Sequence, residues 1–303
     1  MHGLFSGFGD SRVEGKPHLK TDERCSRHLS GNPTYQELTA FWYNCGVFGM
    51  TKAKLPITSE QQLWVDSSFI RLAALVGSNR LLQATVVLPT PEHFPDAYDS
   101  SEIALRRMFH RVAAQMQVDP ADVDLTLFAS GDGITRDFVP FYSGKTSGAA
   151  GLYHHDPTER PRISINEAQL KDPLALVATL AHELGHIMLL RPGLVDRNDP
   201  DMEPLNDLLT IFLGFGVFTA NSAFRFEQHT DYLSRGWSTR RIGYLSEEQL
   251  GYALARFAFE RGEGKPAWVS FLSTNVAAYL KRSAVWLARQ RGPHLFVAEK
   301  DRS

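Results

Sequence analysis

The sequence contains only two cysteines, Cys25 and Cys45, among its 303 residues, and both lie near the N-terminus. This low count excludes a fold held together by many disulfides and a metal site built from several thiolates. The chain also has no large excess of charge of either sign, because it contains 32 basic and 34 acidic residues and its formal net charge is -2. Such a chain has no general attraction for nucleic acid or an anionic membrane, so we expect neither as a partner.

Long apolar runs are also scarce. The opening residues, MHGLFSGFGDSRVEGK, hold no apolar stretch of signal-peptide length behind a basic start, which favours a cytoplasmic protein. The charge-free stretch from Leu208 to Ala220 has thirteen residues. As a helix it would rise about 20 Å, less than the roughly 30 Å of a hydrocarbon core. We therefore interpret it as a buried core helix and predict no membrane span.

Apolar residues nevertheless make up 43% of the chain, enough for a sizeable core in one large or two ordinary domains. Apolar periodicity and capping residues predict helices at 32–50, 58–77, 101–116, 172–190, 202–224, 246–262 and 266–291. Short β-rich runs between Gly or Pro turns predict strands at 81–89, 124–130, 136–144, 151–155 and 161–166.

These elements predict an α+β fold with a small, mostly antiparallel sheet, a long helix after it and a mainly helical C-terminal half. We divide the chain into a loose N-terminal arm at 1–32, a region at 33–190 with the helical layer, the sheet and the long helix, and a mainly helical subdomain at 191–303. We expect the functional cleft at the junction of the last two.

The long helix contains the sequence H-E-x-x-H, formed by His182, Glu183 and His186. Residues four apart share one face of a helix, so both imidazoles can bind a single ion. Glu183 lies about 100° round the helix from His182, where its carboxylate can reach a water on that ion. Zinc lowers the pKa of such a water towards roughly 7, and a nearby carboxylate can take its proton as hydroxide attacks a carbonyl. The motif therefore predicts a hydrolase with one Zn²⁺ per chain and Glu183 as the catalytic base.

Two histidines and a glutamate can also fall into a helix by chance. The stretch ALVATLAHELGHIMLL is apolar nearly all round, so we expect it to be buried. A buried helix seldom carries such residues unless they are paired or bind a metal. Gly185, between the histidines, lowers helix stability, which indicates a requirement of packing or access.

A catalytic zinc site needs a third protein ligand, and the stretch DPDMEPLNDLL offers Asp201, Glu203 and Asp207. Glu203 and Asp207 lie four apart, so one can bind the metal while the other accepts a hydrogen bond from an imidazole N–H. The competing interpretation is the ordinary enrichment of carboxylates at the start of a helix.

This combination, H-E-L-G-H followed by a helix with Glu-x-x-x-Asp, resembles the gluzincin, or thermolysin-like, branch of the zincin metallopeptidases. The resemblance covers about 162–223 and implies zinc ligands at His182, His186 and Glu203, a base at Glu183 and an orienting carboxylate at Asp207. Pro204 directly after Glu203 disfavours a helical conformation there, which leaves Asp207 or Asp201 as alternative third ligands.

The metzincin extension of the motif is absent, since Leu189 and Pro192 stand at its Gly and His positions. Zincins also present an edge strand beside the cleft, which implies a substrate-binding strand formed by Arg162, Ile163, Ser164, Ile165 and Asn166. Gluzincins stabilise the oxyanion with a Tyr or His, for which the candidates are His229, Tyr232 and Tyr244 downstream, with Tyr153, His154 and His155 before the motif.

The function expected from these residues is zinc-dependent hydrolysis of peptide bonds in a peptide or protein substrate. One alternative keeps the zinc cleft but uses it for another hydrolysis or for a regulatory or binding role. A further alternative is a metal-free helical interaction protein in which the buried histidines are satisfied by hydrogen bonds.

Overall fold

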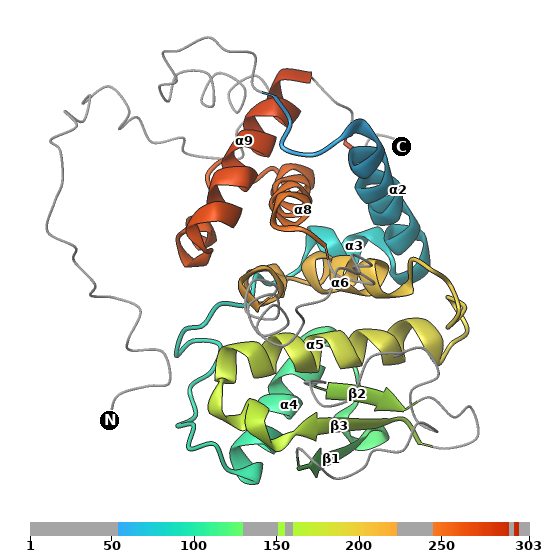
Figure 1. Cartoon of the computed structure of the whole chain (residues 1–303), viewed down its shortest axis with the longest axis vertical. Helices are drawn as coiled ribbons and strands as arrows, with labels where there is room; N and C mark the ends of the chain where they lie inside the picture. Colours follow the sequence, from blue (N-terminus) through green and yellow to red (C-terminus); the bar gives the residue numbers. More distant parts are fainter. Residues whose placement is uncertain (1–53, 130–150, 155–159, 223–244, 291–293, 297–303) are drawn as a thin grey trace, which may run out of the picture.

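Helices and one small sheet make up the described part of the chain, in an α+β arrangement (Figure 1). The computed structural model describes residues 54–129, 151–154, 160–222, 245–290 and 294–296. The predicted helix at 32–50 and the predicted strand at 136–144 lie outside these residues. The sheet lies on one side of α5 and the helix α6 lies on the other (Figure 1).

The two long helices α2 and α4 begin where the sequence predicts, whereas the short helix α3 between them is not predicted. α2 covers Ser59–Val76 and starts at a reciprocal capping box between Thr58 and Gln61. α3 covers Ser78–Leu82, and α4 covers Glu102–Met116. Both long helices bury one face, although Leu63 of α2 is 69% exposed.

The sheet has the strand order β1-β3-β2, and its two pairings differ in direction. The strands are β1 at Asp124–Phe128, β2 at Gly151–His154 and β3 at Arg162–Asn166. β3 pairs in parallel with β1 and antiparallel with β2. The prediction of a mostly antiparallel sheet is therefore wrong. The turn-rich sequence suggests successive hairpins, but the chain between β1 and β3 is long enough for the crossover that a parallel pair needs.

α5 covers Pro173–Leu190, as the sequence predicts, with the side chain of Asp172 capping its first turn and Pro173 in that turn. It packs against α4, α6 and β2. By length and composition alone α5 could cross a membrane, but 78% of it is buried within the protein, as in a core helix.

The predicted helix at 202–224 is broken in two. α6 covers Met202–Phe212, and a second helical stretch covers 216–222. Between them Gly214 has a φ of +94°, and a side chain there would meet the carbonyl of Thr85. Its own carbonyl accepts a hydrogen bond from the N–H of Val87 at 2.9 Å. The predicted strand at 81–89 is wrong as well, because this stretch ends α3 and then runs extended past Gly214 instead of joining a sheet.

Of the C-terminal helices, α8 packs on α2 and α9 packs on α8. α8 covers Glu247–Glu260 and starts at a capping box between Ser246 and Gln249, and its Arg256 pairs with Asp66 of α2 at 2.9 Å. The predicted helix at 266–291 is interrupted: a short 3₁₀ helix at Ala267–Phe271 precedes α9 at Thr274–Gln290. Asn221 holds the break, since its amide donates to the carbonyl of Phe271 and accepts from the N–H of Ser273.

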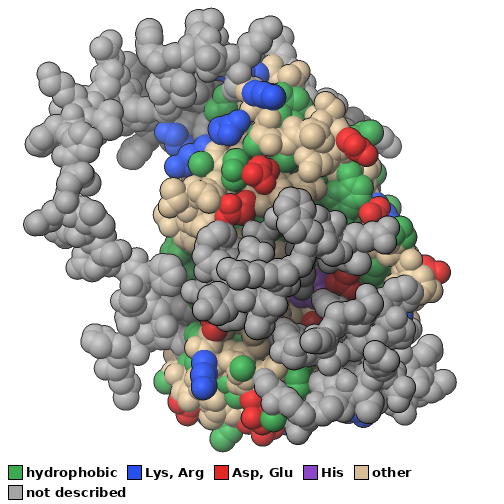
Figure 2. Space-filling view, viewed as in Figure 1, with side chains coloured by type: hydrophobic (Ala, Val, Ile, Leu, Met, Phe, Trp, Pro, Cys, Tyr) green, Lys and Arg blue, Asp and Glu red, His purple; other side chains and the backbone are tan. Residues whose placement is uncertain are grey.

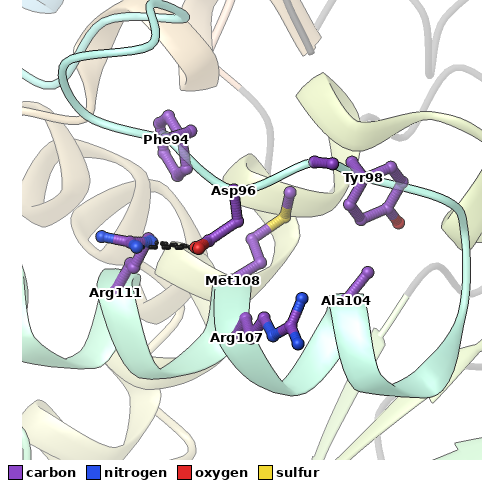
Figure 3. A pocket seen from close by; sticks show the side chains of 8 residues that line it. Phe94, Asp96, Tyr98, Ala104, Arg107, Met108 and Arg111 are labelled. Atoms are coloured by element: carbon purple, nitrogen blue, oxygen red, sulfur yellow. Dashed lines mark hydrogen bonds and ion pairs between the residues drawn. The ribbon is translucent and has the colours of Figure 1, made fainter. Parts of the chain in front are cut away.

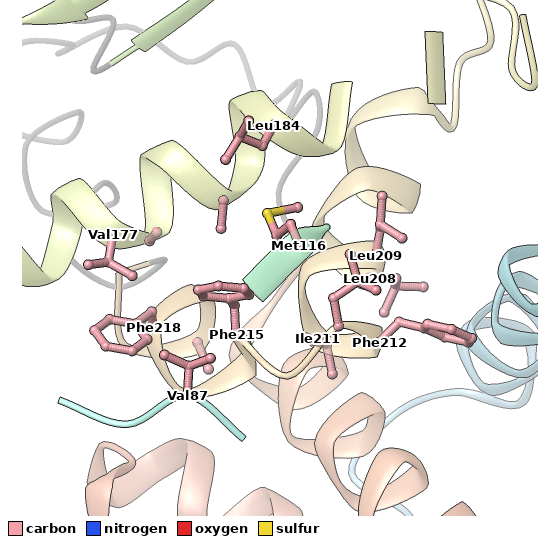
Figure 4. Packing of buried hydrophobic residues seen from close by; sticks show 14 of the residues in the cluster. Val87, Met116, Val177, Leu184, Leu208, Leu209, Ile211, Phe212, Phe215 and Phe218 are labelled. Atoms are coloured by element: carbon pink, nitrogen blue, oxygen red, sulfur yellow. The ribbon is translucent and has the colours of Figure 1, made fainter. Parts of the chain in front are cut away.

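The hydrophobic core joins α5 to α6 and to the segments around them. Figure 4 shows the side chains that fill this layer: Val87, Met116, Val177, Leu184, Leu208, Leu209, Ile211, Phe212, Phe215 and Phe218. The apolar stretch at 208–220 is therefore core, as predicted, although it is not one continuous helix.

A small pocket lies between α4 and the loop that precedes it (Figure 3). Phe94, Tyr98 and Met108 contribute to its wall, and Arg111 pairs with Asp96 at its rim. The pocket contains none of the residues that the sequence analysis assigns to chemistry.

Candidate metal centre

Three candidate ligand atoms from two helices lie within a few ångströms of one another. Nε2 of His182 lies 3.2 Å from Nε2 of His186, and both histidines come from the same face of α5. Oε2 of Glu203, from the first turn of α6, lies 3.0 Å from the first nitrogen and 3.4 Å from the second. In one view of the surface, histidine and acidic side chains lie together near its middle (Figure 2).

This triangle has the dimensions of a zinc site. Ligand atoms about 2.0–2.1 Å from a zinc ion in a regular tetrahedron are about 3.3–3.4 Å apart. The three observed separations, 3.0, 3.2 and 3.4 Å, are close to one face of that tetrahedron. Two imidazoles and one carboxylate are also a donor set that catalytic zinc sites use. The residues therefore fit a zinc ion.

The hydrogen bonding of His182 points to a cation at the same position. Oδ1 of Asp207 lies 3.0 Å from Nδ1 of His182, and an ionised carboxylate can only accept, so Nδ1 carries the proton. In a neutral ring Nε2 then presents a lone pair to Oε2 of Glu203, 3.0 Å away. Two acceptors this close repel each other unless a cation lies between them, either a metal ion or a second proton on His182.

The three carboxylates named as possible third ligands have separate partners. Glu203 faces both imidazoles, and Asp207 bonds to the ring nitrogen of His182 that points away from the cluster. Asp201 lies outside the cluster and accepts a hydrogen bond from Nε1 of Trp64 at 3.1 Å. The geometry favours Glu203 over the two alternatives.

The expected effect of Pro204 on Glu203 is absent, because Glu203 lies inside α6. Pro204 occupies the first turn of that helix, where its missing N–H would have no partner within the helix in any case. The constraint that proline places on the residue before it is a preference, and here the helix overrides it.

Glu183 is buried beside the start of β2. A side chain at Gly151 would meet Thr179 and Glu183, so only glycine lets the strand approach α5 this closely. Burial raises the pKa of Glu183, whereas positive charge on His186 and His182 and the backbone N–H of Tyr153 act in the opposite direction. The carboxyl group is thus kept close to the histidines without being part of the ligand triangle.

The ring of His186 packs against an aromatic side chain of β2. It stacks on the ring of Tyr153, with centroids 5.9 Å apart and an angle of 9° between the planes. Its Nδ1 is buried and has no hydrogen-bond partner within the described part of the chain. Packing against Tyr153 therefore restricts the ring of His186, whereas a hydrogen bond from Nδ1 to Asp207 orients the ring of His182.

The charges in the cluster shift the pKa values of two of its members in opposite directions. Burial lowers the pKa of His182, but hydrogen bonds to Asp207 and Glu203 outweigh this and hold it well above its ordinary value. Burial raises the pKa of Glu203, but hydrogen bonds to His182 and His186 outweigh this and lower it.

These shifts predict how pH changes the stability of the metal-free protein. The folded-state pKa of His182 exceeds its unfolded value of about 6.5. Protonated His182 therefore contributes fully to the free energy of unfolding below about pH 6.5. This contribution is lost as the pH rises through the folded-state pKa. Glu203 has a lowered pKa, so its contribution is present above about pH 4.3 and is lost as the pH falls through its folded-state pKa. We expect the free energy of unfolding of the chelated protein to decline above about pH 6.5.

Urea unfolding of the metal-free protein, prepared with a chelator, between about pH 6 and about pH 9 would measure this decline. In His182→Ala the free energy of unfolding should change much less with pH, because the imidazole that gives up the proton is missing. Added zinc should also reduce this change with pH in the wild type, because zinc binds the deprotonated imidazole. Equal changes with pH in the wild type and in His182→Ala would contradict this prediction.

The predicted substrate strand is not at an edge. β3, with Arg162, Ile163, Ser164, Ile165 and Asn166, is the central strand of the described sheet, because β1 and β2 pair on its two sides. β2 is the strand that packs against α5, and it carries Tyr153. The candidate oxyanion donors His229, Tyr232 and Tyr244 lie outside the described residues, as does His155.

Sequence reasoning missed one buried residue at the centre and one contact. Asn206, between the two acidic residues of α6, is fully buried and donates to the backbone carbonyl of His182 at 2.9 Å. The glycine at position 151 also escaped notice. In the sequence, Asn206 is visible only as a polar residue before Asp207, and Gly151 only as a glycine near Tyr153. Neither position indicates a particular role by itself.

Compared with protein-family models, curated proteins and solved structures, the chain matches none of them.

Proposed function

We propose that the protein is a zinc-dependent hydrolase that cleaves peptide bonds in a peptide or protein substrate. The observation that carries the proposal is the meeting of His182, His186 and Glu203, whose ligand atoms all lie within 4.8 Å of one another, beside the buried carboxyl of Glu183. Glu203 is 40% exposed at its side chain, so solvent reaches the cluster from its side.

Each residue has a role that its position supports. His182 and His186 would hold the ion through Nε2 and Glu203 through Oε2, while Asp207 keeps the proton on Nδ1 of His182. When bound, zinc lowers the pKa of a coordinated water towards about 7 and polarises a carbonyl group. The carboxylate of Glu183 would take a proton from the attacking water and deliver it to the amide nitrogen as the C–N bond breaks.

The arrangement of the elements around α5 supports this proposal. A helix with two histidines, packed on one side by a sheet and on the other by a helix with Glu203 and Asp207, has the order of elements expected of a zincin-like, gluzincin-type centre. The proposal of peptide substrates draws on that likeness. A second candidate is a zinc centre used for another hydrolysis, favoured by the fact that the site residues alone define metal chemistry and not a substrate.

Incubation of the full-length chain with a peptide library of mixed sequence, in the presence of zinc, tests the proposal. We expect cleavage products by mass spectrometry, their loss after chelation, and their return when zinc is restored. The chelated sample is the control, because it contains the same protein without metal. Stoichiometric zinc without any cleavage would overturn the peptidase proposal in favour of the second candidate.

A further inference from the structure

We propose that Asn206 is a positioning residue of the metal centre, which sets the spacing of α5 and α6 at the level of the ligands. This inference rests on the proposed function, because it assigns Asn206 a role in holding the ion. Asn206 does not reach the ligand triangle itself. It contacts the backbone of His182, and it occupies the space that a side chain at position 185 of α5 would take.

The first contact ties the two helices together directly beside a ligand. Nδ2 of Asn206 donates to the backbone carbonyl of His182 at 2.9 Å, and the asparagine is fully buried. The carbonyl belongs to the residue whose ring carries the candidate ligand atom. A shift of this bond would therefore move His182 relative to α6, and with it the distance to Glu203.

The second contact explains the glycine between the two histidines. A Cβ atom at position 185 would meet Oδ1 of Asn206. Asn206 cannot move out of the way freely, because it is buried and its other amide atom is bonded to His182. Gly185 thus leaves room for Asn206. This packing explains why a residue that lowers helix stability lies inside α5.

The third observation is that the site tolerates an unpaired polar atom. Oδ1 of Asn206 is buried and has no hydrogen-bond partner among the described residues. An amide held in this way costs stability, since a buried acceptor without a partner loses its interaction with water. An apolar side chain would avoid that loss, but it could not bond to the carbonyl of His182.

Asn206 also lies between two functional residues of α6. Glu203 is three positions before it and Asp207 directly follows it, and both contact the ring of His182. The backbone of α5 and the ring of His182 are therefore held by three side chains from one short stretch of α6. A ligand pair from α5 and a ligand from α6 can match a zinc ion only when this spacing is correct.

Zinc affinity, measured by competition with a chelator at equal folded protein, tests the role in positioning. We expect Asn206→Ala to bind zinc about 10- to 100-fold more weakly than the wild type, the range found for residues that orient metal ligands. Asn221→Ala is the matched control, because Asn221 likewise donates to a backbone carbonyl, that of Phe271, and neither residue belongs to the ligand triangle. It should lose thermal stability and keep the affinity of the wild type.

A double-variant cycle tests the packing with Gly185 in the metal-free protein. We expect Gly185→Ala to lower Tm in the wild-type background, because its methyl group meets Asn206. In the Asn206→Ala background the same change should leave Tm unchanged or raise it, because the space is free and alanine favours the helix. The double variant should still bind zinc weakly, since the bond to His182 is missing.

The outcomes separate this inference from the proposed function. If the wild type binds zinc and Asn206→Ala binds it as tightly, the positioning role is overturned while the metal centre stands. If Gly185→Ala has the same effect on Tm in both backgrounds, the proposed fit between the two residues is wrong. If the wild type binds no zinc, the proposed function fails and the role of Asn206 in it fails too.

Discussion

Alanine at His186 or at Glu203 should reduce the zinc content of the purified chain from about one ion to almost none. Each change removes one of three ligand atoms that meet within 4.8 Å, and two protein ligands do not hold zinc against competing chelators. Asp207→Ala removes no ligand. It should keep zinc but bind it about 10- to 100-fold more weakly, because it leaves Nδ1 of His182 without its partner.

Elemental analysis after expression with added zinc and extensive dialysis measures this result. His110→Ala is a suitable control, because His110 is an exposed residue of α4 outside the cluster. The assignment would be wrong if the wild type contained no stoichiometric zinc, or if Glu203→Ala retained it. In the second case the third ligand would have to be sought elsewhere, including in residues outside the described ranges.

Glu183→Gln should lower kcat about 10²- to 10⁴-fold while zinc content stays at the wild-type level. Glutamine has the size and shape of glutamate but cannot accept a proton at neutral pH. Because Glu183 lies beside the ligand triangle and is not part of it, the ligand geometry should survive the change. Cleavage of a peptide found in the library assay, measured together with zinc content, checks both parts.

Glu102→Gln serves as the control for the removal of one carboxylate, since Glu102 is exposed in the first turn of α4. A Glu183→Gln variant with more than about one tenth of the wild-type rate would exclude Glu183 as the general base. Loss of zinc in this variant would instead show that Glu183 has a structural part in the centre.

The elements that the sequence predicted correctly are those with local signals. Asp172 and Pro173 mark the start of α5, and Ser246 with Gln249 marks the start of α8, because a cap is formed by residues within one turn. The spacing of His182 and His186 is local in the same sense. Their position on one face of a helix follows from the helix itself and needs no knowledge of the fold.

The features that could not be predicted depend on segments that are distant in the sequence. The direction of β1 relative to β3, and the central place of β3, are set by a crossover and not by the strand residues. The break at Gly214 is set by the approach of Thr85. The contact between Asn206 and position 185 exists only because two helices cross at that point, which neither segment indicates by itself.

The pair between Asp66 and Arg256 bears on the order in which the chain can fold. Tyr252 and Arg256 of α8 both bond to the carboxylate of Asp66, 190 residues before the arginine. During synthesis α2 emerges long before its partner, and taking a carboxylate out of water without a counter-charge is costly. Contacts of such separation form late, because a long loop must close first. We therefore expect that α2 completes its docking only after α8 has left the ribosome, and that chains ending before residue 246 leave Asp66 solvated and the side of α2 that faces α8 uncovered.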